Sequence, residues 1–168
     1  TVNLLAGASG VGKTCLTASL LTQFRDQLPI FGHPSNPVAG LGYICADRGW
    51  SSTRLWLEKA GYPDIPFYSL VDDLDFDPDK LYNKRALVSI LGESLVSLGL
   101  PPGSLVVVDP IALFMGGNLN DYHACAAALI KIRRIAQRLQ LTLLGLCHSA
   151  KQKADAKDQY RRLQDRIL

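Results

Sequence analysis

Residues 7–14 read Gly-Ala-Ser-Gly-Val-Gly-Lys-Thr and match the pattern G-x-x-x-x-G-K-[S/T]. This run lies between a short apolar segment and a segment of helical periodicity, the context in which the pattern marks a phosphate-binding loop. Glycines let successive backbone N–H groups point into one concavity, and the following helix adds its positive N-terminal end. We expect the loop to bind nucleotide phosphates through Gly7, Ala8, Ser9, Gly10, Val11, Gly12, Lys13, Thr14 and Cys15.

Three side chains are candidates for the charged chemistry at this loop. Lys13 would bridge the β- and γ-phosphates, and Thr14 would hold Mg²⁺ through its hydroxyl. A second metal ligand is expected from the end of a neighbouring buried strand, and Asp109 directly follows the apolar run Leu105–Val108. Taken alone, Asp109 could plausibly be a turn residue before Pro110. Beside a phosphate-binding loop, the metal role is favoured.

The chain lacks two sequence motifs that are typical of proteins that bind GTP. Asp109 is followed by Pro-Ile-Ala and not by the x-x-Gly of a GTPase switch, and residues 83–86 read Asn-Lys-Arg-Ala without the final Asp of a guanine-reading N-K-x-D. ATP is therefore favoured over GTP.

Two further polar residues follow apolar segments. Asp47 follows residues 42–46, and His148 follows residues 142–147. Ligands of open parallel sheets bind outside the carboxyl ends of the strands, so both side chains are catalytic candidates together with Lys13 and Asp109. The alternatives stay open: Asp47 in a solvated ion pair with Arg48 or Arg54, and His148 as a hydrogen-bonded core residue.

Short apolar runs alternate with longer segments of helical period along the whole chain. This alternation predicts an α/β fold with a mostly parallel sheet flanked by helices. In the first helix, Leu16, Leu20 and Phe24 share one face and are predicted to pack on the sheet. The expected strands are residues 2–6, 42–46, 67–71, 105–108 and 142–147, and the expected helices are residues 12–24, 51–60, 77–99 and 121–140.

Composition favours one globular domain over residues 1–168. The 168 residues are 48% hydrophobic with a net charge of +3, which argues against a disordered chain and against nucleic-acid binding by overall charge alone. The charge surplus lies in residues 151–168, so any basic patch is expected there. Four cysteines without a C-x-x-C pair predict buried thiols in a reducing compartment. Without a long apolar segment or a signal peptide, a soluble cytoplasmic protein with no membrane partner is expected.

With these motifs in place, nearly the whole chain resembles the RecA-like P-loop ATPases, and within them the branch of plasmid RepA-type and DnaB-type replicative helicases. Residues 107–110 (Val-Val-Asp-Pro) with the Gly- and Asn-rich residues 116–121 are similar to the family's Walker B strand and the loop that follows it. Residues 144–151 resemble its strand ending in His with a Lys shortly after. Residues 43–49 stand where the family has a strand ending in a catalytic Glu, which puts Asp47 on that position as a departure from Glu.

The resemblance implies more than the residues alone. It implies the strand order 3-2-4-5-1 with the phosphate-loop strand at one edge, His148 as a sensor of the γ-phosphate, and further family strands after Leu168, so that this chain would be C-terminally incomplete and part of a longer protein. It also implies a ring oligomer, a hexamer in the full-length protein. An arginine finger would reach across the subunit interface, with Arg161, Arg162 and Arg166 as the candidates.

The function that the resemblance implies is Mg²⁺-dependent hydrolysis of ATP that powers a DNA helicase of plasmid or phage replication, with single-stranded DNA as a partner. One alternative is an ATP-binding switch or scaffold with little turnover, which the departure at Asp47 favours. A small-molecule kinase suits the length of the chain, but no Arg-rich lid or acceptor-binding motif precedes Asp109.

Overall fold

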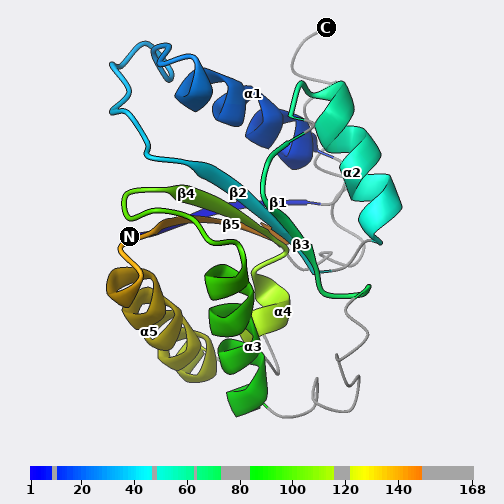
Figure 1. Ribbon diagram of the computed structural model, residues 1–168. Helices are drawn as coiled ribbons and strands as arrows, with labels where there is room; N and C mark the ends of the chain where they lie inside the picture. Colours follow the sequence, from blue (N-terminus) through cyan, green and yellow to red (C-terminus); the bar gives the residue numbers. More distant parts are fainter. Residues whose placement is uncertain (9–10, 47–48, 63, 73–83, 116–121, 149–168) are drawn as a thin grey trace, which may run out of the picture.

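A computed structural model describes residues 1–8, 11–46, 49–62, 64–72, 84–115 and 122–148, which form a sheet between two layers of helices (Figure 1). Within these residues, five parallel strands form one sheet in the order β1-β5-β4-β2-β3. The strands are β1 (Val2–Gly7), β2 (Leu41–Cys45), β3 (Phe67–Ser69), β4 (Leu105–Asp109) and β5 (Thr142–His148). The predicted parallel α/β sheet is confirmed, and β1 lies at its edge as the implied strand order requires.

Helices cover both faces of the sheet. Figure 1 shows α1 (Lys13–Arg25) and α2 (Trp50–Lys59) on one face, and α3 (Lys84–Ser97), α4 (Ala112–Met115) and α5 (Tyr122–Arg138) on the other. The short helix α4 was not predicted, because one turn is too short for a periodic signal. None of the helices in the described ranges has the length and apolarity needed to cross a bilayer.

The core has one cluster on each face of β4, the central strand. Side chains alternate along a strand, so Val106 and Val108 pack towards α3 and α5, whereas Val107 packs towards α1 and α2. All three valines are fully buried. Burial on both faces explains why β4 reads as an uninterrupted apolar run in the sequence.

The predicted apolar face of α1 is only partly correct: Phe24 packs against the core, but the fully buried residues are others. Thr17 and Leu21 are buried, whereas Leu16 is exposed. The loop sets the rotation of the helix: Lys13 is buried against the loop at the first turn, and Thr17 and Leu21 follow it at intervals of four residues. Of the stripe that periodicity selected, Leu16 therefore lies outside the buried face, whereas Phe24 contacts the core at its border.

Candidate nucleotide-binding site

The loop between β1 and α1 has the backbone that the motif predicts in its described part. Gly12 directly precedes α1 with φ of +87°, in the left-handed region that favours glycine. Its carbonyl accepts the hydrogen bond from the N–H of Leu16 at 2.9 Å, which closes the first turn. Gly12 has no side chain that could cap this end of the helix. The N–H groups of the first turn are therefore not capped by the Gly12 side chain, and they lie next to the loop.

Lys13 is held against the loop by two hydrogen bonds. Its Nζ donates to the carbonyl oxygens of Gly7 at 2.8 Å and Ala8 at 2.7 Å, and the side chain is only 7% exposed. An ammonium group has three hydrogens, so one donor is left over for a phosphate oxygen. Space at position 7 is limited, because a Cβ there would lie 3.2 Å from Cγ2 of Val11 and 3.7 Å from Cδ of Lys13.

Asp109 ends β4 with its carboxylate buried. Its Oδ2 accepts a hydrogen bond from the hydroxyl of Tyr43 at 2.8 Å, and its backbone oxygen accepts one from the N–H of Ala46 at 2.8 Å. In the part of the chain that the structure describes, no Lys or Arg forms an ion pair with this carboxylate. A buried carboxylate without a cation is costly, which fits a residue that binds a metal ion.

The donors at this edge fit Mg²⁺. Asp109 supplies a carboxylate and Thr14, half-buried in the first turn of α1, supplies a hydroxyl. Among the described residues, no three His, Cys, Asp or Glu side chains gather into a closed metal site. One carboxylate with a hydroxyl, completed by phosphate oxygens and water, is a donor set typical of Mg²⁺ in nucleotide sites.

The strand ends meet at one edge of the sheet. Gly7 lies in register with His148, and Cys45 lies in register with Asp109. The backbone of β5 therefore brings His148 beside the first glycine of the loop. The side chain of His148 lies outside the described part of the chain, as do Ser9, Gly10, Asp47, residues 116–121 and the candidates Arg161, Arg162 and Arg166, so their roles stay predictions.

Comparison with known proteins identifies the family. The sequence matches the family described as "AAA domain" over residues 1–154. The chain belongs to the AAA domain family. A solved structure with a similar fold is a KaiC-like protein from the hyperthermophilic archaeon Pyrococcus horikoshii, with a TM-score of 0.56 and 15% identity over 89% of this chain and 63% of that chain. Among curated proteins, none matches this sequence.

The structural comparison bears on the predicted fold, and the family match bears on the predicted activity. At 15% identity the KaiC-like structure shows the fold alone, which is RecA-like, and the present chain spans less than two thirds of that protein. Membership of the AAA domain family supports ATP binding and hydrolysis. Both findings agree with the RecA-like P-loop class that the motifs indicate.

The cysteines of this AAA domain differ from the prediction of four buried thiols. Cys45 is buried, Cys125 and Cys147 are half-buried, and Cys15 is exposed on the first turn of α1. Burial raises the pKa of the Cys147 thiol, although the nearby charge of Lys13 acts in the opposite direction. The Cys147 thiol therefore stays protonated beside the loop at neutral pH.

Sequence reasoning missed two residues that shape the site of this AAA domain. In the sequence, Tyr43 reads only as an aromatic residue of an apolar strand. The pairing of β2 with β4 shows that its hydroxyl reaches Asp109. Gly145 reads as a neutral position in an apolar strand, yet a Cβ there would lie 2.7 Å from side-chain atoms of Ile111. A glycine inside a buried strand is the one signal that could have drawn attention to this close approach.

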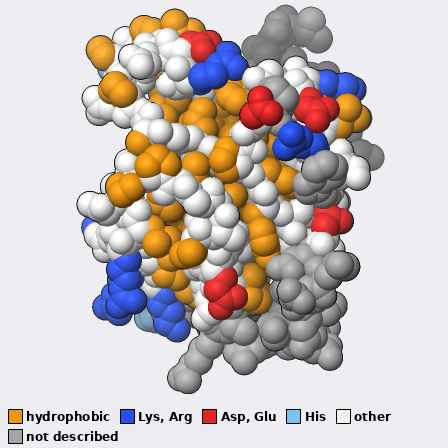
Figure 2. All heavy atoms as spheres, in the orientation of Figure 1, with side chains coloured by type: hydrophobic (Ala, Val, Ile, Leu, Met, Phe, Trp, Pro, Cys, Tyr) orange, Lys and Arg blue, Asp and Glu red, His pale blue; other side chains and the backbone are white. Residues whose placement is uncertain are grey.

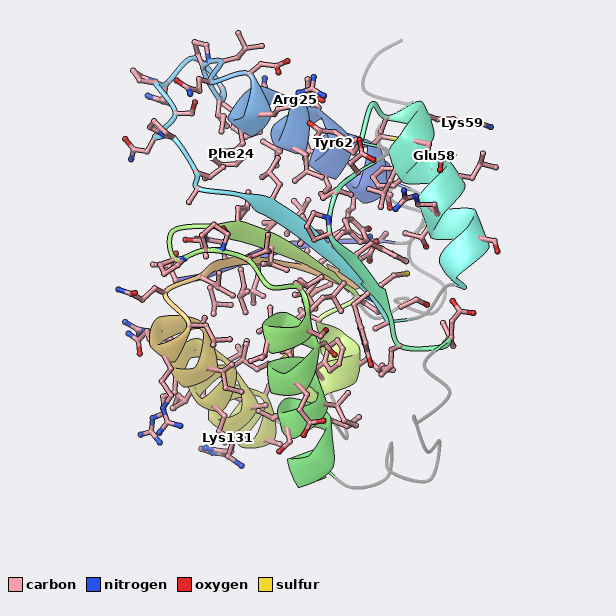
Figure 3. The ribbon with its side chains drawn as sticks, viewed as in Figure 1. Phe24, Arg25, Glu58, Lys59, Tyr62 and Lys131 are labelled. Atoms are coloured by element: carbon pink, nitrogen blue, oxygen red, sulfur yellow. The ribbon has the colours of Figure 1, made fainter. Side chains whose placement is uncertain are left out.

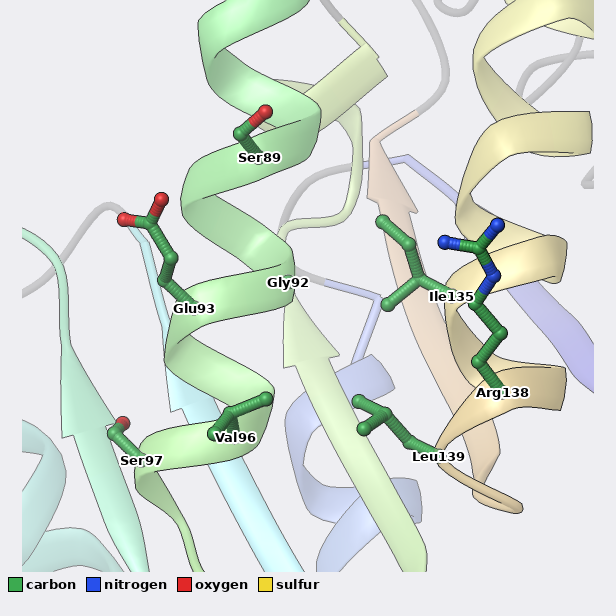
Figure 4. Close-up of a pocket in the computed structure, with 8 residues that line it drawn as sticks. All are labelled: Ser89, Gly92, Glu93, Val96, Ser97, Ile135, Arg138 and Leu139. Atoms are coloured by element: carbon green, nitrogen blue, oxygen red, sulfur yellow. The ribbon is translucent and has the colours of Figure 1, made fainter.

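A separate cavity of about 580 Å³ lies between α3 and α5 (Figure 4). Its apolar lining includes Val96, Ile135 and Leu139, with Glu93 and Arg138 among its polar residues. Figure 2 shows basic side chains gathered over α5, and Lys131 and Arg134 line an adjoining cavity of about 290 Å³. This groove lies on the sheet face opposite α1 and is distinct from the candidate nucleotide site.

Proposed function

We propose that this AAA domain binds Mg-ATP at the loop between β1 and α1 and hydrolyses the β–γ bond. The observation that carries the proposal is the burial of two opposite charges at the same edge of the sheet. Lys13 is 7% exposed and held by carbonyl oxygens of the loop, and Asp109 is 5% exposed at the end of β4. A fixed cation for phosphate and a buried carboxylate for the metal are the two parts that phosphoryl transfer requires.

Each residue has a distinct role in the proposed reaction. Lys13 donates its remaining hydrogen to the β- and γ-phosphates, and Thr14 and Asp109 hold Mg²⁺, which neutralises phosphate charge when bound. Asp47 orients the attacking water and accepts its proton as the water oxygen bonds to the γ-phosphorus. The β–γ bond breaks, which yields ADP and inorganic phosphate. His148 senses the γ-phosphate, and an arginine from a neighbouring subunit completes the site.

The proposed biological output is a DNA motor that works as a ring oligomer. It is supported by the resemblance to replicative helicases and by the charge surplus of residues 151–168. The decisive experiment measures ATP turnover of the full-length protein with and without single-stranded DNA, together with its mass in solution. A turnover that rises with DNA in a hexamer supports the motor. A monomer whose turnover ignores DNA contradicts it.

The second candidate, an ATP-binding switch with little turnover, is favoured by Asp in place of Glu at position 47. Asp47→Asn and Asp47→Glu separate the two functions. If Asp47 orients water, the Asn variant retains ATP affinity and loses turnover, because a carboxylate that acts only in the transition state has been removed. The Glu variant then gains turnover. A wild type that binds ATP tightly and shows no turnover, with both variants equal to it, supports the switch.

A further inference from the structure

We propose that Tyr43 is a positioning residue that orients the Asp109 carboxylate for the metal, a role that rests on the proposed Mg-ATP site. The two residues are far apart in the sequence and belong to neighbouring strands. The Tyr43 hydroxyl donates to Oδ2 of Asp109 at 2.8 Å. Tyr43 is 1% exposed and Asp109 is 5% exposed, so water does not compete for this bond.

Strand register accounts for the reach of the tyrosine. Tyr43 pairs with Val107, and Cys45 pairs with Asp109. Tyr43 therefore lies two residues before the level of Asp109, a distance of about 6.6 Å along the strand. Residues two apart in a strand share a face, so both side chains lie on the α1 and α2 side of the sheet. A tyrosine side chain spans this distance, and its hydroxyl arrives at the carboxyl edge.

The ring of Tyr43 is fixed by aromatic neighbours. Its centroid lies 5.9 Å from that of Trp56 on α2 and 6.4 Å from that of Phe67 on β3, both in tilted arrangements. These separations lie in the range in which aromatic pairs attract each other. The hydroxyl is thus presented from a rigid support, which is the requirement for orienting another group.

The hydrogen bond decides which part of the carboxylate is left for a cation. A carboxylate has two oxygens and rotates easily about its terminal torsion. With Oδ2 bound to Tyr43, Oδ1 is the oxygen without a hydrogen-bond donor among the described residues. Loss of the hydroxyl would leave the carboxylate buried but free to rotate, which weakens metal binding through orientation and leaves the phosphate contacts of Lys13 unaffected.

Tyr62 provides a matched control. It is a second tyrosine of the same core cluster and is 4% exposed, but its hydroxyl has no hydrogen-bond partner within the described residues. Its ring lies beneath the guanidinium of Arg25, 5.0 Å from the centroid (Figure 3). Tyr62→Phe and Tyr43→Phe therefore remove the same atom from the same core, and only Tyr43→Phe removes a bond to Asp109.

The first measurement titrates Mg²⁺ against binding of a fluorescent ATP analogue to the full-length protein. In Tyr43→Phe, we expect the Mg²⁺ concentration at half-saturation to rise about tenfold, the effect of losing one hydrogen bond to a charged group. Affinity measured in EDTA should stay within about twofold of wild type, since the loop is intact. Tyr62→Phe should match wild type in both. An unchanged Mg²⁺ response in Tyr43→Phe overturns the proposal.

The second measurement needs no nucleotide. Urea unfolding of wild type, Tyr43→Phe, Asp109→Ala and the double variant forms a cycle that isolates the pairwise interaction. Tyr43→Phe should destabilise the wild type and have no effect, or stabilise, when Asp109 is already Ala. Asp109→Asn replaces Asp109→Ala if the latter fails to fold. A wild type that binds no ATP overturns the proposed function. If the cycle shows an interaction energy between Tyr43 and Asp109 but Tyr43→Phe leaves the Mg²⁺ concentration at half-saturation unchanged, the hydrogen bond is only structural and the positioning role is overturned.

Discussion

Gly145 on β5 lies against Ile111, the second residue after Asp109. A Cβ added at Gly145 would lie 2.7 Å from both Cδ1 and Cγ2 of Ile111 and 2.9 Å from its Cβ. The N–H of Ile111 also donates to the carbonyl oxygen of Leu146 at 3.0 Å. The chain leaving β4 therefore packs on β5 at a point where a side chain larger than that of glycine would displace Ile111.

Gly145→Ala should destabilise the protein by about 1–3 kcal/mol, because the buried Ile111 must move to admit the methyl group. ATP-independent stability is measured by urea unfolding. Gly92→Ala on α3 is the matched control: its Cβ would meet Ile135 at 3.5 Å, an ordinary contact, and alanine is the better helix former. Equal stability of the Gly145 variant and wild type would show that Ile111 relaxes without cost.

Lys13→Ala should weaken ATP binding by about 1.5–3 kcal/mol, the effect of losing a hydrogen bond from a charged group. The measurement is equilibrium titration of a fluorescent ATP analogue in the presence of Mg²⁺. Lys59→Ala removes the same side chain from the last turn of α2, where it is exposed, and should leave affinity unchanged. An affinity of the Lys13 variant within about twofold of wild type would argue against the nucleotide site.

Alkylation of cysteines should report nucleotide at the loop. Cys15 is exposed and directly follows Thr14, so iodoacetamide should modify it first and ATP should protect it. Cys147 should react slowly at neutral pH, because burial raises its pKa and lowers the thiolate fraction, and its rate should rise as pH increases. Peptide mass spectrometry measures both rates. Equal labelling of Cys15 with and without ATP would place the nucleotide elsewhere.

Replacing Lys151, Lys153 and Lys157 by Ala tests whether the basic segment 151–168 binds DNA. Single-stranded DNA affinity should fall, and its dependence on log salt should flatten by about 0.7 for each phosphate that a lysine no longer neutralises. Titrations of the full-length protein at several salt concentrations measure both quantities. If affinity and slope do not change, the segment does not contact DNA, and residues 116–121 become the next candidate.

The parts of the site that could be predicted are those that depend on residues close together in the sequence. The loop before α1 is a strand, a glycine-rich turn and a helix in succession, so its type follows from one short segment. Asp109 was located because β4 is buried on both faces and reads as an apolar run with a carboxylate at its end. The expected bounds of the strands lie within one residue of the observed ones, except for β3, which ends at Ser69, two residues earlier than expected.

Only the tertiary structure decided how these segments meet. Periodicity identified α1 but selected Leu16 as a buried residue, because the rotation of the helix depends on where the loop holds Lys13. The bond from Tyr43 to Asp109 depends on β2 lying beside β4 in one register, and the fit of Gly145 depends on where the chain packs on β5. The contacts of Tyr43 and Gly145 join residues distant in the chain, and spacing along a sequence carries no information on strand order or register. The residue types for phosphate and metal chemistry are thus local properties of this sequence, whereas their mutual orientation arises from packing.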